Sequence, residues 1–237
     1  MTSETAPDVM SRLSTLAVAG WLLCAGAALQ AQPSAAEGAP PRTPPGPART
    51  FNIDPQSSSV TLRVFREGAL SVLAHDHVLV ASGIAGRLTL DEQDPRRSAL
   101  QLSVPVASLE IDNPEQRKRE KFASTLSKKD IEQIRAIVMS TDYLDEANYP
   151  RVTITAVEAA GTLPTLSVGL NVRIKQVDKI YRVPAQIAVE GDTLRATGEL
   201  FLLQSDFGMK PYSSLLGLIA VQDPVQIRFE IVAHEQR

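Results

Sequence analysis

The chain has very few residues of the kinds that cross-link a fold or hold a metal. Cysteine occurs once in 237 residues, at Cys24, and histidine occurs three times, at His75, His77 and His234. A single cysteine cannot form an internal disulfide bond, and it cannot supply a cysteine-rich zinc site. The stability of a folded domain must therefore come from the packing of its apolar core.

Strong net charge and aromatic side chains are also scarce. The formal net charge is −3, and only 5% of the residues are aromatic. Proteins that bind nucleic acid usually present a basic surface, and many of them stack bases on aromatic rings. The composition therefore argues against a nucleic-acid partner and against a stacking platform for bases or sugars.

The common signatures of catalysis are missing as well. The sequence has no Gly-x-Ser-x-Gly elbow, no phosphate-binding loop and no dinucleotide fingerprint. The triplet Asp206-Phe207-Gly208 lacks the glycine-rich loop and strand lysine that accompany it in kinases, so we expect Asp206 to fix a loop that bends at Gly208. We expect a protein that is not an enzyme and that has no cofactor.

The first 50 residues predict export followed by a tether. The segment Leu13–Leu29 is uncharged and rich in Leu and Ala, and Arg12 precedes it, so residues 1–31 match a signal peptide. An anchor through Cys24 is disfavoured because Leu23 precedes it where a small residue is wanted. Residues 32–50 include six prolines in nineteen residues, which predicts a disordered linker. We expect the domain to span residues 51–237 and to be periplasmic or secreted.

What the chain does have is alternation of apolar and polar residues. This period of two is typical of strands with one face on a core and the other in water. Because eight such runs follow one another, the sequence predicts an all-β fold with an inserted helix, namely an eight-stranded antiparallel β-barrel plus one or two short helices. The inward positions lie within residues 60–64, 84–90, 100–106, 152–156, 166–174, 181–189, 194–202 and 225–231.

The break between the third and fourth runs predicts helices. Asn113 is a favourable helix cap and Pro114 suits the first helical position, while a second short helix is expected after Ser127. The charged run from Arg117 to Lys121 is expected to be a solvated helix face. Between the sixth and seventh runs, Gly191-Asp192 predicts a tight hairpin.

The triplet His75-Asp76-His77 is the clearest group of residues that could carry chemistry. In an extended segment both imidazoles point to one side, where a metal or haem iron could bind them. Two ligands do not complete a site, and the alternative is a polar turn in which Asp76 accepts backbone hydrogen bonds. A metal- or haem-binding, redox-related envelope protein that uses His75 and His77 is the alternative functional hypothesis.

Several short motifs resemble the YceI-like proteins. They are Phe51-Asn52-Ile53-Asp54-Pro55 with Ser58-Ser59-Val60, Tyr143-Leu144-Asp145 with Tyr149-Pro150, and Ser205-Asp206-Phe207-Gly208-Met209, in that order between Phe51 and Ala233. The resemblance implies a lipocalin-like barrel whose elongated apolar cavity holds a polyisoprenoid or similar long-chain lipid, as in exported bacterial proteins. It brings no catalytic residues, and the stretch from Glu67 to Val80 departs from the family's pattern.

We therefore predict a monomeric or homodimeric exported protein that sequesters or carries a long-chain apolar ligand. Arg63, Arg173 and Lys175 are candidates to meet a polar head of the ligand at the mouth. The residues expected to contact the ligand itself come from the inward face of the strands and from the apolar loop after Gly208. They are Val64, Leu102, Ile154, Leu170, Val172, Ala185, Leu200, Phe207, Leu216 and Phe229.

Overall fold

The structure is a computed structural model that describes residues 47–236. The predicted signal peptide, Cys24 and most of the predicted linker lie outside the described residues. The first strand begins at Arg49, two residues before the predicted domain boundary at residue 51. Arg49 is held there by an ion pair of 2.6 Å to Glu235.

The described residues form mostly strands. In chain order they are β1 (Arg49–Ile53), β2 (Ser59–Glu67), β3 (His77–Ala81), β4 (Ala85–Leu90), β5 (Ala99–Pro105), β6 (Glu110–Ile111), β7 (Arg151–Thr162), β8 (Thr165–Ile174), β9 (Val177–Glu190), β10 (Thr193–Leu203), β11 (Ser213–Ser214) and β12 (Ile219–Glu235). The helices are α1 (Pro114–Arg119) and α2 (Lys128–Met139), and the 3₁₀ turns are η1 (Ser71–Leu73), η2 (Pro95–Arg97), η3 (Val106–Ser108), η4 (Ser205–Phe207) and η5 (Leu215–Gly217).

Eight antiparallel strands close into a barrel. The order is β1-β4-β5-β7-β8-β9-β10-β12, and β12 pairs back onto β1 to complete the ring. The predicted eight-stranded antiparallel barrel with two short helices is therefore confirmed. Closure removes free strand edges from this ring, so its backbone hydrogen bonds are satisfied between neighbours.

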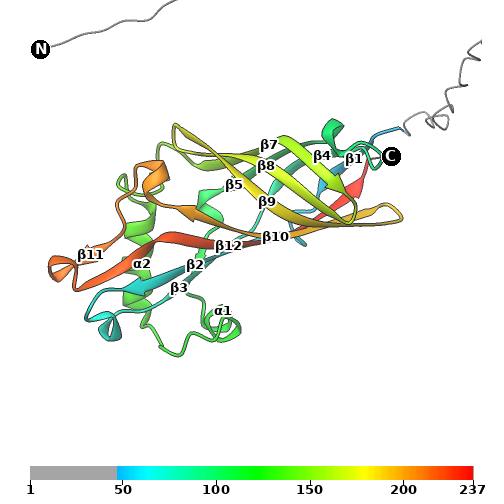
Figure 1. Cartoon of the computed structure of the whole chain (residues 1–237). Coiled ribbons are helices and arrows are strands. Elements are labelled where there is room, and N and C mark those ends of the chain that lie inside the picture. The colour runs from blue at the N-terminus through cyan, green and yellow to red at the C-terminus, as the bar shows by residue number, and fades with distance from the viewer. Residues whose placement is uncertain (1–46, 237) are drawn as a thin grey trace, which may run out of the picture. The chain divides into compact units, whose positions relative to one another are not determined.

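Strands β2, β3 and β6 extend the wall at one end of the barrel (Figure 1). β12 pairs with β1 only near its C-terminus, and its earlier residues pair with β2, which continues to β3 and β6. A buried cluster is formed here by Leu79 of β3, Ile111 of β6 and Val106 of η3. Ile134 and Val138 of α2 pack against it. The helix α2 thus lies against the wall at this end of the barrel.

The other end of the barrel is packed shut. Phe51 of β1, Leu194 of β10 and Ala233 of β12 are fully buried there and belong to the largest apolar cluster. In the part of the chain that the structure describes, none of the helices is long and apolar enough to cross a membrane.

The local signals in the sequence are confirmed at the turns. Asn113 accepts a hydrogen bond from the backbone N–H of Glu115 at 2.8 Å, and Ser127 forms a capping box with Asp130 at the start of α2. Gly191 has φ 61°, as the predicted tight hairpin requires.

Two predictions for these segments are wrong in part. The eight alternating runs omit β1 and β3, because β1 is short and β3 is nearly continuous in apolar residues. Arg117 does not lie on a solvated face, because only 4% of the residue is exposed and its guanidinium forms an ion pair with the buried Asp112.

Gly198 of β10 is required by the ring of Phe229, which lies opposite it on β12. A Cβ atom at position 198 would come within 2.5 Å of Phe229 Cζ and 2.8 Å of the Pro184 carbonyl oxygen. We expect Gly198→Ala to lower the free energy of unfolding by about 1–3 kcal/mol, because the ring and a backbone must move apart. Thr197→Ser, on the exposed face beside it, is the control and should stay within about 0.5 kcal/mol of the parent. Equal denaturant midpoints for parent and Gly198→Ala would contradict this account.

Candidate functional site

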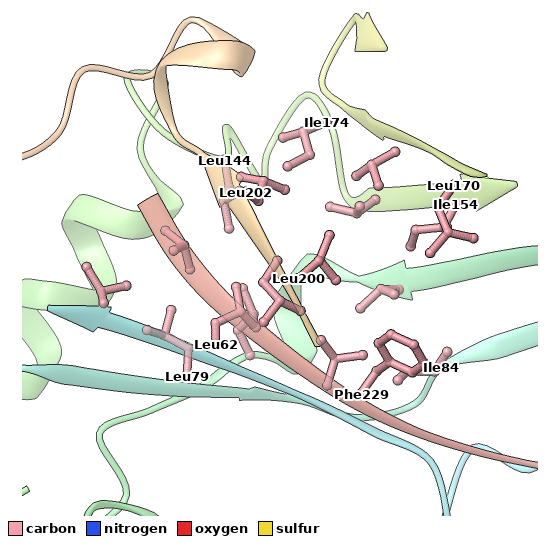
Figure 2. A pocket seen from close by; sticks show the side chains of 18 of the residues that line it. Leu62, Leu79, Ile84, Leu144, Ile154, Leu170, Ile174, Leu200, Leu202 and Phe229 are labelled. Carbon is pink, nitrogen blue, oxygen red and sulfur yellow. The ribbon is translucent and has the colours of Figure 1, made fainter. Parts of the chain in front are cut away.

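The barrel encloses a cavity of about 650 Å³. Its wall is built from the inward side chains of the strands, and these are mostly Leu, Val, Ile and Ala. Figure 2 shows Leu62 and Leu79 on one side and Ile154 and Leu170 on another, all directed into the same space. An eight-stranded ring has just enough width for side chains to fill it or for one slender ligand to fit. Here the inward side chains are too short to meet.

Most of the residues predicted to contact a ligand lie in this wall. Eight of the ten do so, namely Val64, Leu102, Ile154, Leu170, Val172, Ala185, Leu200 and Phe229. The structure brings them together from seven different strands, because the alternating phase of each strand directs them inward. Their contact with a ligand remains a prediction.

The other two predicted residues lie elsewhere. Phe207 is only 1% exposed and packs with Met209 and with the ring of Tyr181, so it belongs to the core and not to the cavity wall. Leu216 is fully exposed in η5. Both follow β10 in an irregular segment, where no period fixes the direction of a side chain.

The mouth of the cavity lies between η1, α2 and the segment before β11. Leu73, Ile137 and Tyr212 line the cavity and are also exposed to solvent. The cavity therefore has an apolar interior and opens to solvent at this end.

The polar side chains near the mouth include His75, Asp130 and Gln133. The Nδ1 atom of His75 is buried and has no hydrogen-bond partner among the described residues. Hydrogen bonds from the side chain and backbone N–H of Ser127 hold the pKa of Asp130 below its usual range, and the nearby His75 acts in the same direction. Asp130 is therefore an anion at neutral pH.

The wall contains no lysine or arginine among the residues that the structure describes. The cations expected at the mouth are engaged elsewhere: Arg63 Nε lies 3.2 Å from Glu120, and Arg173 lies 2.6 Å from Asp178. Lys175 Nζ is 3.5 Å from the carbonyl oxygen of Thr141. The expectation that one of them meets a ligand head at the mouth receives no support.

His77 is held in position by a buried ionic cluster that it forms with Asp112 and Arg117. Its Nδ1 lies 2.6 Å from Oδ2 of Asp112, and Arg117 Nη1 lies 2.5 Å from Oδ1 of the same carboxylate. The N–H of Val78 also donates to Asp112, and Arg117 donates to the carbonyl oxygen of Asp76. Asp112 thus ties α1 to the start of β3 and holds the His75-Asp76-His77 triplet in place.

The protonation state of Asp112 follows from the same contacts. Burial by itself raises the pKa of this carboxyl group, but the hydrogen bond and charge of His77, with the bonds from Val78 and Arg117, outweigh burial and lower the pKa below its usual value. Asp112 is therefore ionised in the folded protein. No pattern in the sequence indicates this role, because Asp112 and Arg117 look like ordinary surface residues beside a helix cap.

The metal hypothesis for His75 and His77 finds only part of what it needs. Both imidazoles line the cavity, but Nδ1 of His77 is already bonded to Asp112. Within residues 47–236, no group of three or more His, Cys, Asp or Glu side chains is placed to hold a metal ion. A metal at this pair stays an untested prediction.

We expect Asp112→Asn to lower the free energy of unfolding by about 3–5 kcal/mol at pH 7, because it leaves the buried Arg117 without a counter-charge. The contribution of a carboxylate with a lowered pKa is present above the ordinary value of about 3.9 and is lost as the pH falls through the folded-state value. The gap between parent and variant should therefore narrow below about pH 4 in urea titrations.

The exposed pair Arg195–Glu230 offers the control for this measurement. Glu230→Gln should change stability by less than about 1 kcal/mol at pH 7. A gap for Asp112→Asn that widens in acid would contradict the assigned ionisation.

Comparisons with known proteins agree with this geometry. The model of the YceI-like domain matches residues 51–233. BcnA of Burkholderia cenocepacia has a similar structure, with a TM-score of 0.56 and 18% sequence identity over 76% of this chain and 98% of that chain. A polyisoprenoid binding domain from Saccharophagus degradans aligns with a TM-score of 0.52 and 10% identity over 78% of this chain and 98% of that chain.

At such identities the likeness of the structures shows a common fold, and none of the curated proteins matches the chain. The family match covers nearly the whole barrel, from within β1 to Ala233 in β12. The predicted resemblance is thereby confirmed, and the chain belongs to the family of YceI-like domain proteins.

Proposed function

We propose that this protein is an exported carrier that sequesters one long-chain apolar molecule, a polyisoprenoid or a similar lipid, in its barrel. The observation that carries the proposal is the hollow apolar interior of the barrel. Export to the periplasm or out of the cell is supported by the apolar segment Leu13–Leu29 behind Arg12.

The energetics favour a ligand that is almost wholly hydrocarbon. Burial of apolar surface contributes about 25 cal/mol per Å² before the costs of ordering the ligand. The cavity of about 650 Å³ falls inside the range of roughly 300–1,000 Å³ typical of small-molecule sites. A neighbour of the same fold is described as a polyisoprenoid binding domain, which is the kind of ligand that such a wall suits.

The mouth adds a preference for the head of that ligand. His75 lines the cavity near its mouth, Asp130 is an anion, and no lysine or arginine lines the wall in the part of the chain described. An alcohol or carbonyl head can hydrogen-bond to an imidazole there, whereas a diphosphate would meet a carboxylate without any lysine or arginine to neutralise it. We therefore assign an uncharged head to the ligand and place it near His75.

Filling the cavity tests the carrier function. Leu200→Trp directs an indole into the hollow, and we expect at least about tenfold weaker binding of a C20 prenyl alcohol, because the added ring removes volume from the site. Phe201→Trp on the same strand is exposed and should bind as the parent does. Native mass spectrometry and titration report occupancy. A parent protein that neither co-purifies with lipid nor takes up added prenyl lipid would overturn the proposal.

Head selectivity has its own test. The C20 alcohol should bind at least about tenfold more tightly than the C20 diphosphate of the same chain. His75→Ala should weaken the binding of the C20 alcohol by roughly three- to tenfold, because one hydrogen bond to the head is lost. Squalene, which has no head, should bind parent and His75→Ala alike. If alcohol and diphosphate bind equally, the head lies in water outside the mouth and only the carrier function stands.

A further inference from the structure

The exposed apolar side chains of this protein are concentrated in two short loops. Six large aliphatic side chains lie in the turn between β2 and β3 and in the turn between β11 and β12. We call this surface the apolar tip, and it consists of Leu70, Val72, Leu73, Leu215, Leu216 and Leu218. They make up half of the twelve large apolar side chains that are exposed in the described residues.

The two loops form one surface. The N–H of Leu70 donates to the carbonyl oxygen of Leu218 at 2.8 Å. Gly68 has φ 96° and passes so close to Leu218 that a Cβ atom there would lie 2.5 Å from its carbonyl oxygen. In Figure 1, β11 and the turn after β2 project from the same end of the barrel as α2, opposite to β1. The apolar tip is therefore a single fixed feature.

The conformation of η5 directs leucines outward. Leu215 and Leu216 have φ 49° and 58°, a left-handed conformation that is unfavourable for residues with a branched side chain. Leu216 has a relative exposure of 106%, so the strained backbone does not serve burial within the barrel. A protein that kept these leucines only for its own core would have no need of this arrangement.

The tip is continuous with the mouth of the cavity. Leu73 belongs to both, since it lines the cavity and is 64% exposed. Tyr212, just before β11, and Ile137 of α2 also line the cavity and reach solvent. An apolar path therefore runs from the outermost leucine to the interior without crossing a charged side chain in the two loops.

The charge pattern matches a bilayer interior better than an ionic surface. Residues 68–74 and 211–222 contain no Asp, Glu, Lys or Arg. The charges that flank them are of both signs: Arg66 and Glu67 precede the first loop, and Lys210 and Asp223 enclose the second. Insertion of such a tip depends on apolar burial and does not depend on anionic lipid.

We propose that the apolar tip docks into the surface of a lipid bilayer, so that a ligand passes between the membrane and the cavity without entering water. The inference rests on the proposed carrier function, because a ligand that is almost insoluble in water has to be collected from and released to a membrane. A bilayer is the occupant because the tip protrudes, is aliphatic and joins the mouth. Docking interfaces between proteins are instead enriched in aromatic residues and arginine.

The experiment compares parent, Leu215→Ser/Leu216→Ser and Val157→Ser/Ile180→Ser with vesicles of phosphatidylcholine. Val157 and Ile180 are exposed apolar residues of β7 and β9 outside both loops, with exposures of 53% and 64%, so they match the tip leucines in kind. We expect at least about tenfold weaker partitioning for the tip variant and no change for the wall variant. Adding phosphatidylglycerol or salt should change the partitioning of the parent protein to the vesicles only little.

Transfer assays separate docking from binding. With a C20 prenyl alcohol supplied from ethanol, the tip variant should bind as the parent does, but its uptake of the same alcohol from vesicles should be at least about tenfold slower. Equal partitioning of parent and tip variant, or a parent dimer that the tip substitutions dissociate without any vesicle binding, would overturn docking. Failure of all proteins to bind the alcohol from ethanol would instead overturn the carrier function.

Discussion

The structure depends on a mismatch between the width of its barrel and the length of its inward side chains. Eight antiparallel strands fix the circumference once β12 has paired with β1. The residues that face inward are mostly of medium or small size, with Ala156, Ala185 and Ala196 among them. At the β1 end Phe51 is fully buried, whereas towards α2 Tyr143 and Tyr212 line the cavity without filling it. The hollow is thus a property of the whole wall and of no single residue.

The two ends of the barrel serve different purposes. The β1 end contains part of the largest apolar cluster, with Phe51, Leu194 and Ala233 fully buried. At the other end β12 pairs with β2 instead of β1, and β3 and β6 continue the sheet. Helix α2 packs against this part, where the mouth lies. The ionic cluster of Asp112, Arg117 and His77 ties β3 to α1 at this end and holds the histidine triplet in place.

The features around the mouth are consistent with one another. An aliphatic tip formed by η1 and η5, loops without charges and the proposed uncharged head near His75 would all favour the proposed movement of an apolar molecule through this end. The Glu67–Val80 segment contributes to each of them, since it holds Leu70, Leu73 and His75.

The sequence alone determined most of the barrel wall, because alternation sets the face of each residue in the strands that alternate: Leu102, Ile154 and Leu200 could be assigned to the interior without coordinates. Local caps at Asn113 and Ser127 were readable for the same reason, since their hydrogen bonds lie within three residues. Only the tertiary structure decided that Arg117 is buried, that Phe207 is core and Leu216 exposed, and that the cavity opens between η1, α2 and the segment before β11. These outcomes depend on contacts between distant segments, as between Leu70 and Leu218, and no local period encodes such contacts.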